Sequence, residues 1–150
     1  MSGNPVSDIV RAVQSLLHSD RHIVHVGTDS QTFGDHTNFV TVVAIVEPGF
    51  GGRVLYCRER TPRAHSLAHK LFREAELSLV AAMQLDSEIA HDIIVHVDAN
   101  QDERHSSSKY VRALAGMVIG HGFQVRVKPD SWCATHVADH LVKGKHPYAA

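Results

Sequence analysis

Runs of β-branched and apolar residues dominate the first third of the chain and predict a sheet. Three such runs cover residues 22–30, 38–48 and 52–60. The sequences TFGDHT and GFGG separate them, and glycine-containing segments of this kind are typical of loops and hairpins. The pattern therefore predicts a three-stranded antiparallel meander. Before it, apolar residues at helical spacing over 7–18 predict a short amphipathic helix.

The hydrophobic period changes after Pro62, and the second half of the chain alternates helices with strands. Residues 64–86 carry an apolar stripe at helical spacing, which predicts a long helix. The nearly unbroken apolar run in 92–100 is typical of a parallel strand that is covered on both faces. The remaining patterns predict a helix over 107–121, a strand over 123–129 and a final helix over about 131–143.

This order of elements predicts one α/β domain with a mixed five-stranded sheet. A helical crossover after the third strand can return the chain beside the first strand, and the right-handedness of such crossovers leaves few arrangements. The predicted strand order is 3-2-1-4-5, with flanking helices and an extra N-terminal helix. We expect a single domain over 1–150, made of the N-terminal helix (1–20), a core (22–143) and a tail (144–150).

The composition narrows the classes of function. The 150 residues include 15 Lys and Arg against 16 Asp and Glu, so the formal net charge of -1 excludes a uniformly basic nucleic-acid binder and a strongly acidic disordered chain. Cys57 and Cys133 lie far apart and no secretory signal precedes them, which favours reduced cysteines and a cytoplasmic protein. The apolar runs are shorter than the roughly 20 residues of a transmembrane helix, so we expect no membrane span.

Two aspartates end the strands that the predicted topology makes neighbours. Asp29 lies in VGTDSQ at the carboxyl end of the first strand, and Asp98 lies in VHVDAN at the carboxyl end of the fourth. Open α/β sheets bind ligands beyond the carboxyl ends of strands whose connections diverge. Two carboxylates held close together repel each other unless a divalent cation lies between them. The pair therefore predicts a metal site.

The long helix supplies a third carboxylate. Glu74 belongs to the apolar stripe, between Leu71 and Ser78. Glu76 projects roughly 200° away from it on the helical wheel, at about 100° per residue. A carboxylate on a buried stripe is costly without a partner, and Mg²⁺ takes oxygen ligands. We therefore predict that Glu74 is a metal ligand and that Glu76 lies in solvent.

The C-terminal segment KPDSWCATHVADHLVK offers two candidates for a fourth acid. Asp130 stands just before the predicted final helix, where an aspartate commonly caps the first turn. Asp139 lies inside that helix, where capping gives it no role. We favour Asp139 as the fourth ligand and keep Asp130 as the alternative.

These four acids stand in an order that resembles the ribonuclease H-like superfamily of nucleases, resolvases and integrases. The segments VGTDSQ, VHVDAN, GHGF and KPDSWCATHVADHLVK are similar, more narrowly, to its YkuK-type bacterial family. The resemblance covers about 22–143 and implies a ribonuclease H-like fold, two Mg²⁺ or Mn²⁺ ions, and four residues as ligands and catalytic groups: Asp29, Glu74, Asp98 and Asp139. HVAD is also similar to the His-x-x-Asp of some RuvC-type resolvases, which implies a catalytic role for His136.

Basic and hydroxyl side chains close to these acids in the sequence are candidates for contacts with nucleic acid. Ser106, Ser107 and Lys109 begin the helix after Asp98, where they can hold a phosphate or simply cap the helix. Lys128 is a further candidate at the end of the last strand. Five more basic residues form either a rim for a nucleic-acid backbone or a solvated face: Arg58, Arg60, Arg63, Lys70 and Arg73.

We expect a divalent-metal-dependent nuclease that hydrolyses nucleic-acid phosphodiesters by a two-metal mechanism. The alternative is a non-catalytic ribonuclease H-like module that binds nucleic acid or a protein, and a third hypothesis is a small-molecule phosphohydrolase. Ser30 and Gln31 follow Asp29 where ribonuclease H has glycine, so specificity for an RNA:DNA hybrid is not supported. The sequence leaves open whether the substrate is RNA or DNA, whether cleavage is internal or terminal, and whether the chain forms a homodimer.

Overall fold

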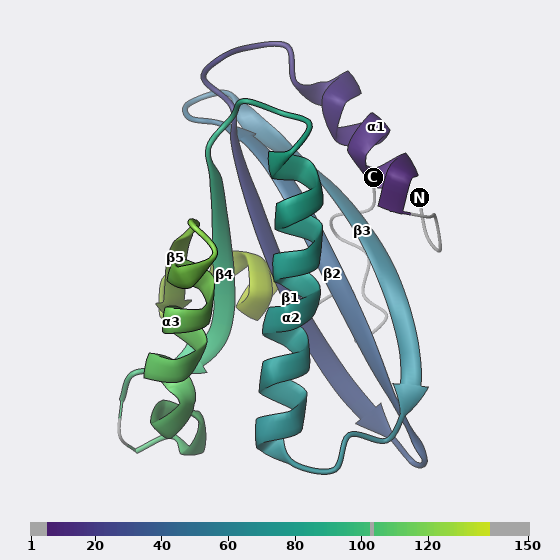
Figure 1. Cartoon of the computed structure of the whole chain (residues 1–150), viewed down its shortest axis with the longest axis vertical. Helices are drawn as coiled ribbons and strands as arrows, with labels where there is room; N and C mark the ends of the chain where they lie inside the picture. The colour runs from purple at the N-terminus through teal and green to yellow at the C-terminus, as the bar shows by residue number, and fades with distance from the viewer. Residues whose placement is uncertain (1–5, 103, 139–150) are drawn as a thin grey trace.

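A five-stranded mixed sheet forms the centre of the fold (Figure 1). The computed structural model describes residues 6–102 and 104–138. The strand order β3-β2-β1-β4-β5 is the predicted one, so the α/β class and the topology are confirmed. The strands are β1 (Ile23–Phe33), β2 (His36–Glu47), β3 (Gly51–Pro62), β4 (Ile93–Asn100) and β5 (Gln124–Lys128).

The first three strands form the predicted antiparallel meander. β1 pairs with β2 from Ile23–Val46 to Phe33–His36, and β3 continues the sheet on the far side of β2. At the GFGG turn Gly49 and Gly51 have φ values of 85° and 91°, which glycine adopts without steric cost. β1 and β4 then pair in parallel, as the right-handed crossover requires.

Helices cover the two faces of the sheet unequally. Figure 1 shows α2 (Leu67–Asp86) lying along the sheet with α3 (Val111–Gly120) beside it and α1 (Val6–Leu16) near one end. The opposite face carries η2, a π-helical segment (Cys133–Ala138), across β1 and β2. None of the helices in the described ranges is long and apolar enough to span a membrane.

Each face has its own apolar core. The larger cluster joins α1, α2 and α3 to the sheet and includes Val26, Leu79, Val95 and Leu114. The smaller one joins η2 to β2 and includes Val40, Val42, Cys133 and Val137. At roughly 25 cal/mol per Å² of apolar surface removed from water, these contacts hold α2 and η2 in register with the strands. The functional side chains described below depend on that register.

All four predicted helices differ from the structure at their boundaries, and the first covers Val6–Leu16 rather than 7–18. The long helix begins at Leu67 rather than at 64, because the Ser66 hydroxyl caps it by accepting a hydrogen bond from the His69 amide at 3.1 Å. The predicted helix 107–121 is divided into a 3-10 segment, η1 (Ser106–Tyr110), and α3. The predicted final helix is π-helical over Cys133–Ala138, and residues 139–150 lie outside the described ranges.

Candidate metal centre

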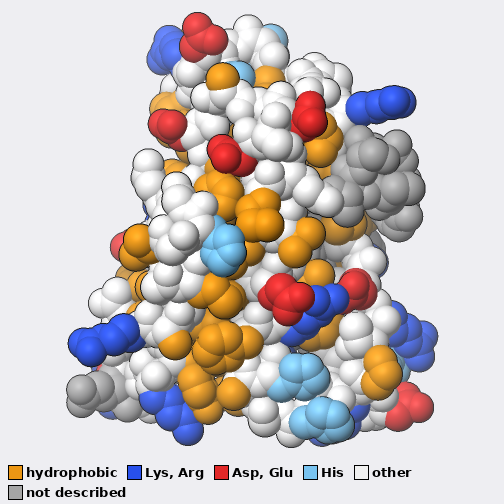
Figure 2. Space-filling model, in the orientation of Figure 1, with side chains coloured by type: hydrophobic (Ala, Val, Ile, Leu, Met, Phe, Trp, Pro, Cys, Tyr) orange, Lys and Arg blue, Asp and Glu red, His pale blue; other side chains and the backbone are white. Residues whose placement is uncertain are grey.

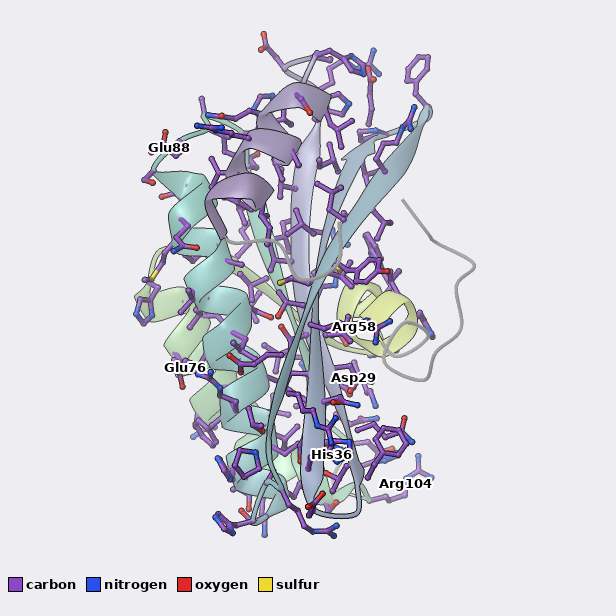
Figure 3. The ribbon with its side chains drawn as sticks, turned by 90° about the vertical axis from the view of Figure 1, so that its right-hand side faces the viewer. Asp29, His36, Arg58, Glu76, Glu88 and Arg104 are labelled. Carbon is purple, nitrogen blue, oxygen red and sulfur yellow. The ribbon has the colours of Figure 1, made fainter. Side chains whose placement is uncertain are left out.

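The carboxyl ends of β1 and β4 bring Asp29 and Asp98 to the same face of the sheet. Parallel pairing of these strands ends at Gly27–His96, and each aspartate lies two residues further along its strand. Because side chains alternate along a strand, both share the face of Gly27 and His96. Figure 3 shows Asp29 on this side, the side of η2. Asp29 is buried, and the Asp98 side chain is 19% exposed.

An irregularity between β4 and β5 lies at Asp98. His96 pairs with Arg126 and Asn100 pairs with Lys128, so three residues of β4 stand opposite one residue of β5. The extra residues bend the strand locally, a feature that often re-aims side chains beside active sites. Lys128 thereby reaches Asp98, with its Nζ 2.9 Å from Oδ1.

Glu74 approaches the aspartates from the opposite face, on α2. One ligand oxygen from each of Asp29, Glu74 and Asp98 lies within 4.8 Å of the other two. Glu74 is 4% exposed, and the Ser30 hydroxyl donates a hydrogen bond to its Oε2 at 2.5 Å. The pairing of β1 with β4 ends at Gly27–His96, and carboxylates from the two faces meet beyond that point.

The environment of Glu74 disfavours its charge. Burial, together with the nearby Asp98 carboxylate, raises the pKa of Glu74 to about 8, although the Ser30 hydrogen bond and two lysines oppose this shift. Three carboxylates that meet at one point fit a hard divalent cation, which takes carboxylate oxygens as ligands. Asp29, Glu74 and Asp98 are therefore the residues of the described chain that would hold such an ion.

Glu76 has the solvated position that the helical wheel predicts. Its side chain is 60% exposed and accepts a hydrogen bond from Arg73 at 2.9 Å, and Arg73 also pairs with Glu59 at 2.8 Å. Figure 2 shows acidic and basic side chains next to one another on this face of the molecule. This arrangement supports the interpretation of Arg73 as part of a charge-balanced surface rather than a rim for a polyanion.

Metal binding at this cluster is expected to release a proton and to strengthen with pH. A ligand carboxyl with a pKa of about 8 is mostly protonated at pH 7 and must lose its proton to bind. The apparent Mg²⁺ affinity should therefore rise up to about tenfold per pH unit below pH 8 and level off above it. Calorimetric titrations in buffers of different ionisation enthalpy measure the number of protons released when Mg²⁺ binds.

Two glutamates of α2 provide the test variant and its control for this prediction. Glu74→Gln should abolish Mg²⁺ binding together with the proton release, and Glu76→Gln should leave both within about twofold of the parent, because Glu76 lies outside the cluster. An equal loss in the two variants, or no proton release by the parent at pH 7, would contradict the assignment of Glu74.

A buried histidine pair lies under the aspartates. His25 Nδ1 and His96 Nε2 are 2.9 Å apart, and the ring of Trp132 packs on both imidazoles, with centroids 4.7 and 5.0 Å away. The amide of Cys133 donates to His96 Nδ1 at 3.3 Å, which ties the start of η2 to the pair. Burial and the charge of Arg126 lower the pKa of His25 to about 4, and burial, His25 and Arg126 lower that of His96 to about 3. Both rings are therefore neutral at physiological pH.

The free energy of unfolding is expected to fall as the pH drops below about 6.5 because of this pair. The unfolded imidazoles bind protons near pH 6.5 whereas the folded ones do not, so protons favour the unfolded state. The loss is at most about 1.4 kcal/mol per pH unit for each ring, down to about pH 4. Urea unfolding at pH 7.5, 5.5 and 4.5 measures it, and native ring resonances of His25 and His96 that titrate near pH 6.5 would contradict it.

The other predicted site residues have varied outcomes. Asp139, the favoured fourth acid, lies outside the described residues. Asp130 is exposed in the turn after β5 and is not part of the cluster found in the described ranges. His136 is exposed on η2. The candidates for phosphate contacts, Ser106, Ser107 and Lys109, all lie in η1, and their binding of phosphate stays a prediction. The Ser107 hydroxyl accepts a hydrogen bond from the Asn100 amide at 3.1 Å. The Lys109 ammonium lies 5.1 Å from the centroid of the Tyr110 ring.

Several residues of the site were not identified from the sequence. In the sequence, Ser30 stands out only as a departure from the ribonuclease H pattern, and its hydrogen bond to Glu74 is not predicted. No motif in the sequence marks His25 or His96 as part of the site. Strand alternation carries a usable signal, because His25 stands two residues before Gly27 and His96 two before Asp98, all on one face. The contact of Lys128 with Asp98 has no such signal, since it depends on the irregular register of β5.

Comparison with known proteins identifies a family model, a curated relative and solved structures that resemble this chain. A family model described as Ribonuclease H-like matches residues 5–143. YkuK, an uncharacterised protein of Bacillus subtilis strain 168, is 23% identical in an alignment of length 154 that covers 91% of this chain and 90% of YkuK. RNase H1 of Halobacterium salinarum NRC-1 is 18% identical with a TM-score of 0.46 over 81% of this chain and 98% of its own. The RNase H domain of Rv2228c from Mycobacterium tuberculosis is 12% identical with a TM-score of 0.39, over 81% and 94%.

Proposed function

The chain belongs to the ribonuclease H-like family, and from this membership and its carboxylate cluster we propose that it is a divalent-metal-dependent nuclease. The observation that carries the proposal is the meeting of Asp29, Glu74 and Asp98, from three separate elements, within 4.8 Å. Two Mg²⁺ or Mn²⁺ ions bound there would activate the attacking water and stabilise the leaving oxyanion of a phosphodiester. Asp139 is proposed as the fourth ligand, and His136 as a catalytic residue near the same site.

The roles of the protein's own groups follow from their positions. Ser30 orients the Glu74 carboxylate through its hydrogen bond, and burial of Glu74 keeps bulk water away from that side of the cluster. Lys128 holds Asp98 in the absence of a stronger cation and is free to turn toward a phosphate once Asp98 has another partner. The site therefore combines fixed carboxylates with one mobile positive charge.

A hollow lined by Lys128, the ion-pair partner of Asp98, supports nucleic acid as the substrate. Its volume is about 650 Å³, and Lys128 lines it together with Gln101, Arg126 and Trp132. Arg126 and Lys128 suit phosphate oxygens, and the exposed part of Trp132 offers a surface on which a base can stack. We propose that the strand to be cut lies in this hollow with the scissile phosphate toward the carboxylates.

The second candidate function is a binding module without cleavage. The ion pair between Lys128 and Asp98 favours it, because an ammonium 2.9 Å from Oδ1 supplies positive charge that a metal would otherwise bring. In that case nucleic acid would bind the same hollow, and added Mg²⁺ would change neither affinity nor covalent structure.

A cleavage assay on a substrate panel separates these functions. The panel holds single-stranded and duplex DNA and RNA, an RNA:DNA hybrid, a four-way junction and a small phosphodiester, each with Mg²⁺, Mn²⁺ or EDTA. Metal-dependent cleavage of any polynucleotide, lost in EDTA, supports the nuclease. Binding without cleavage supports the module, and cleavage of the small ester alone supports a small-molecule phosphohydrolase.

A further inference from the structure

A second group of metal-binding side chains lies at the other end of β1. His22 directly precedes β1, Glu47 ends β2, and His18 lies in the turn that follows α1. One ligand atom from each of the three lies within 4.8 Å of the other two. His22 and Asp29 are separated by seven residues of extended strand, about 23 Å at roughly 3.3 Å per residue. The group is therefore distinct from the carboxylate cluster.

The His22–Glu47 distance in this group is too long for a hydrogen bond and close to the distance between two ligands of one ion. His22 Nε2 and Glu47 Oε2 are 3.7 Å apart, which is too long for a hydrogen bond. Two ligands held at about 2.0–2.1 Å by a tetrahedral zinc ion are about 3.3 Å apart, so a small shift would make both bind one ion. The rings of His18 and His22 lie edge to face with centroids 4.5 Å apart, which brings a second imidazole to the same place.

His22 gives an independent reason to expect a ligand. The residue is 6% exposed, and its Nδ1 has no hydrogen-bond partner within the described part of the chain. A buried ring nitrogen that makes no such bond is destabilising, because it has lost water without replacement. Coordination to a cation would use one ring nitrogen and fix the proton on the other.

The donor set selects the kind of cation. Two imidazoles and one carboxylate suit Zn²⁺, whereas Mg²⁺ requires oxygen ligands and binds imidazole poorly. Three protein ligands leave one position of a tetrahedral ion for water, and a hollow of about 420 Å³ that includes His18, Phe50 and Arg53 in its wall gives access to it. We propose that His18, His22 and Glu47 bind one Zn²⁺ ion with a water molecule as its fourth ligand.

The site would tie the connection between α1 and β1 to the end of β2. His18 and His22 belong to the connection between α1 and β1, and Glu47 belongs to the β2–β3 end of the meander. An ion bound to all three closes this connection onto the sheet. Zinc binding should therefore raise the melting temperature of the protein as well as occupying the site, because a ligand that binds only the folded state stabilises it.

Titration of the full chain with Zn²⁺ in excess Mg²⁺ tests the proposal. The excess Mg²⁺ occupies the carboxylate cluster, and a chromophoric chelator reports the free zinc. We expect one tight equivalent per chain, and a Co²⁺-loaded sample with the visible absorption of a tetrahedral nitrogen and oxygen site. His18→Ala should weaken the zinc affinity at least about 100-fold, because it removes one of three ligands from an exposed position.

Matched variants separate this site from adventitious zinc on a chain with 13 histidines. His121→Ala removes an exposed imidazole elsewhere and should leave the tight equivalent unchanged, whereas Glu47→Gln should lose it. Circular dichroism and retained Mg²⁺ binding check that the variants fold. The proposal is overturned if His18→Ala and Glu47→Gln both bind zinc as the parent does, if His121→Ala loses the tight equivalent, or if only Asp98→Asn loses it.

Discussion

Asp98→Asn is expected to lower the rate of Mg²⁺-dependent phosphodiester cleavage on the order of a thousandfold. The asparagine keeps the size of the side chain but removes the negative charge that a divalent ion requires, and groups that act as one unit lose most of their effect when one is removed. The substitution also leaves the Lys128 ammonium without its carboxylate partner, close to Glu74. Cleavage rates and Mg²⁺ affinity are measured on the same sample. The comparison shows whether the variant has lost metal binding or has lost the cleavage step with the metal still bound.

The control for this experiment is Asp130→Asn. Asp130 lies in the wall of the hollow that Lys128 lines, but it is exposed and lies outside the carboxylate cluster. Its variant should cleave within about twofold of the parent, as surface substitutions usually do. A large loss would instead identify Asp130 as the fourth ligand in place of Asp139. If Asp98→Asn cleaves as fast as the parent in the presence of Mg²⁺, the proposed nuclease centre is wrong.

Two rules explain the part of the site that the sequence predicts, namely the order of the strands and the spacing of residues along a helix. Asp29 and Asp98 end strands that the order of elements makes neighbours, so topology alone brings them together. Glu74 and Glu76 are two residues apart on α2, so the helical period points their side chains in different directions. Glu74 is 4% exposed, whereas the Glu76 side chain is 60% exposed. The first rule needs the order of the elements along the chain and the second needs the position of a residue within its helix, and a single sequence records both.

The part that the sequence does not predict depends on contacts between elements. Lys128 is the last residue of the five-residue strand β5, and its contact with Asp98 is set by the irregular pairing that places Lys128 opposite Asn100. The long helix begins three residues late because Ser66 caps it, although the apolar pattern extends further back. The sequence also does not predict the division of 107–121 into η1 and α3. Hydrophobic spacing does not distinguish a 3-10 turn from the first turn of an α-helix.

Gly27 is another residue whose role emerges only from tertiary packing. It lies in β1 between His25 and Asp29, on the face that η2 covers. A Cβ atom at Gly27 would lie 2.7 Å from the Ala134 nitrogen and 2.9 Å from the Cys133 carbonyl carbon. Real side chains do not approach backbone atoms so closely, and these atoms cannot turn aside as the end of a flexible side chain can. The absence of a side chain therefore lets η2 approach β1 above the histidine pair.

Gly27→Ala is expected to reduce the free energy of unfolding by about 3 kcal/mol, in the range of severe overpacking. The added methyl group must push η2 away from β1, which loosens the packing of Trp132 on His25 and His96. Trp132 is the single tryptophan of the chain, so its fluorescence reports this movement directly. Urea unfolding followed by fluorescence and by circular dichroism measures the loss of stability and the displacement of η2 in one experiment.

Gly116→Ala is the matched control, and its expected effect has the opposite sign. Gly116 lies within α3, and a Cβ atom there would meet no atom within 4 Å. Alanine in a helix interior is favoured over glycine by about 0.8–1 kcal/mol, so this variant should be slightly more stable than the parent. If Gly27→Ala is instead as stable as Gly116→Ala, with unchanged Trp132 fluorescence, η2 does not pack against β1 at Gly27. The segment that leads toward Asp139 would then have no fixed position beside the carboxylates, and the proposal of Asp139 as the fourth ligand would lose its structural basis.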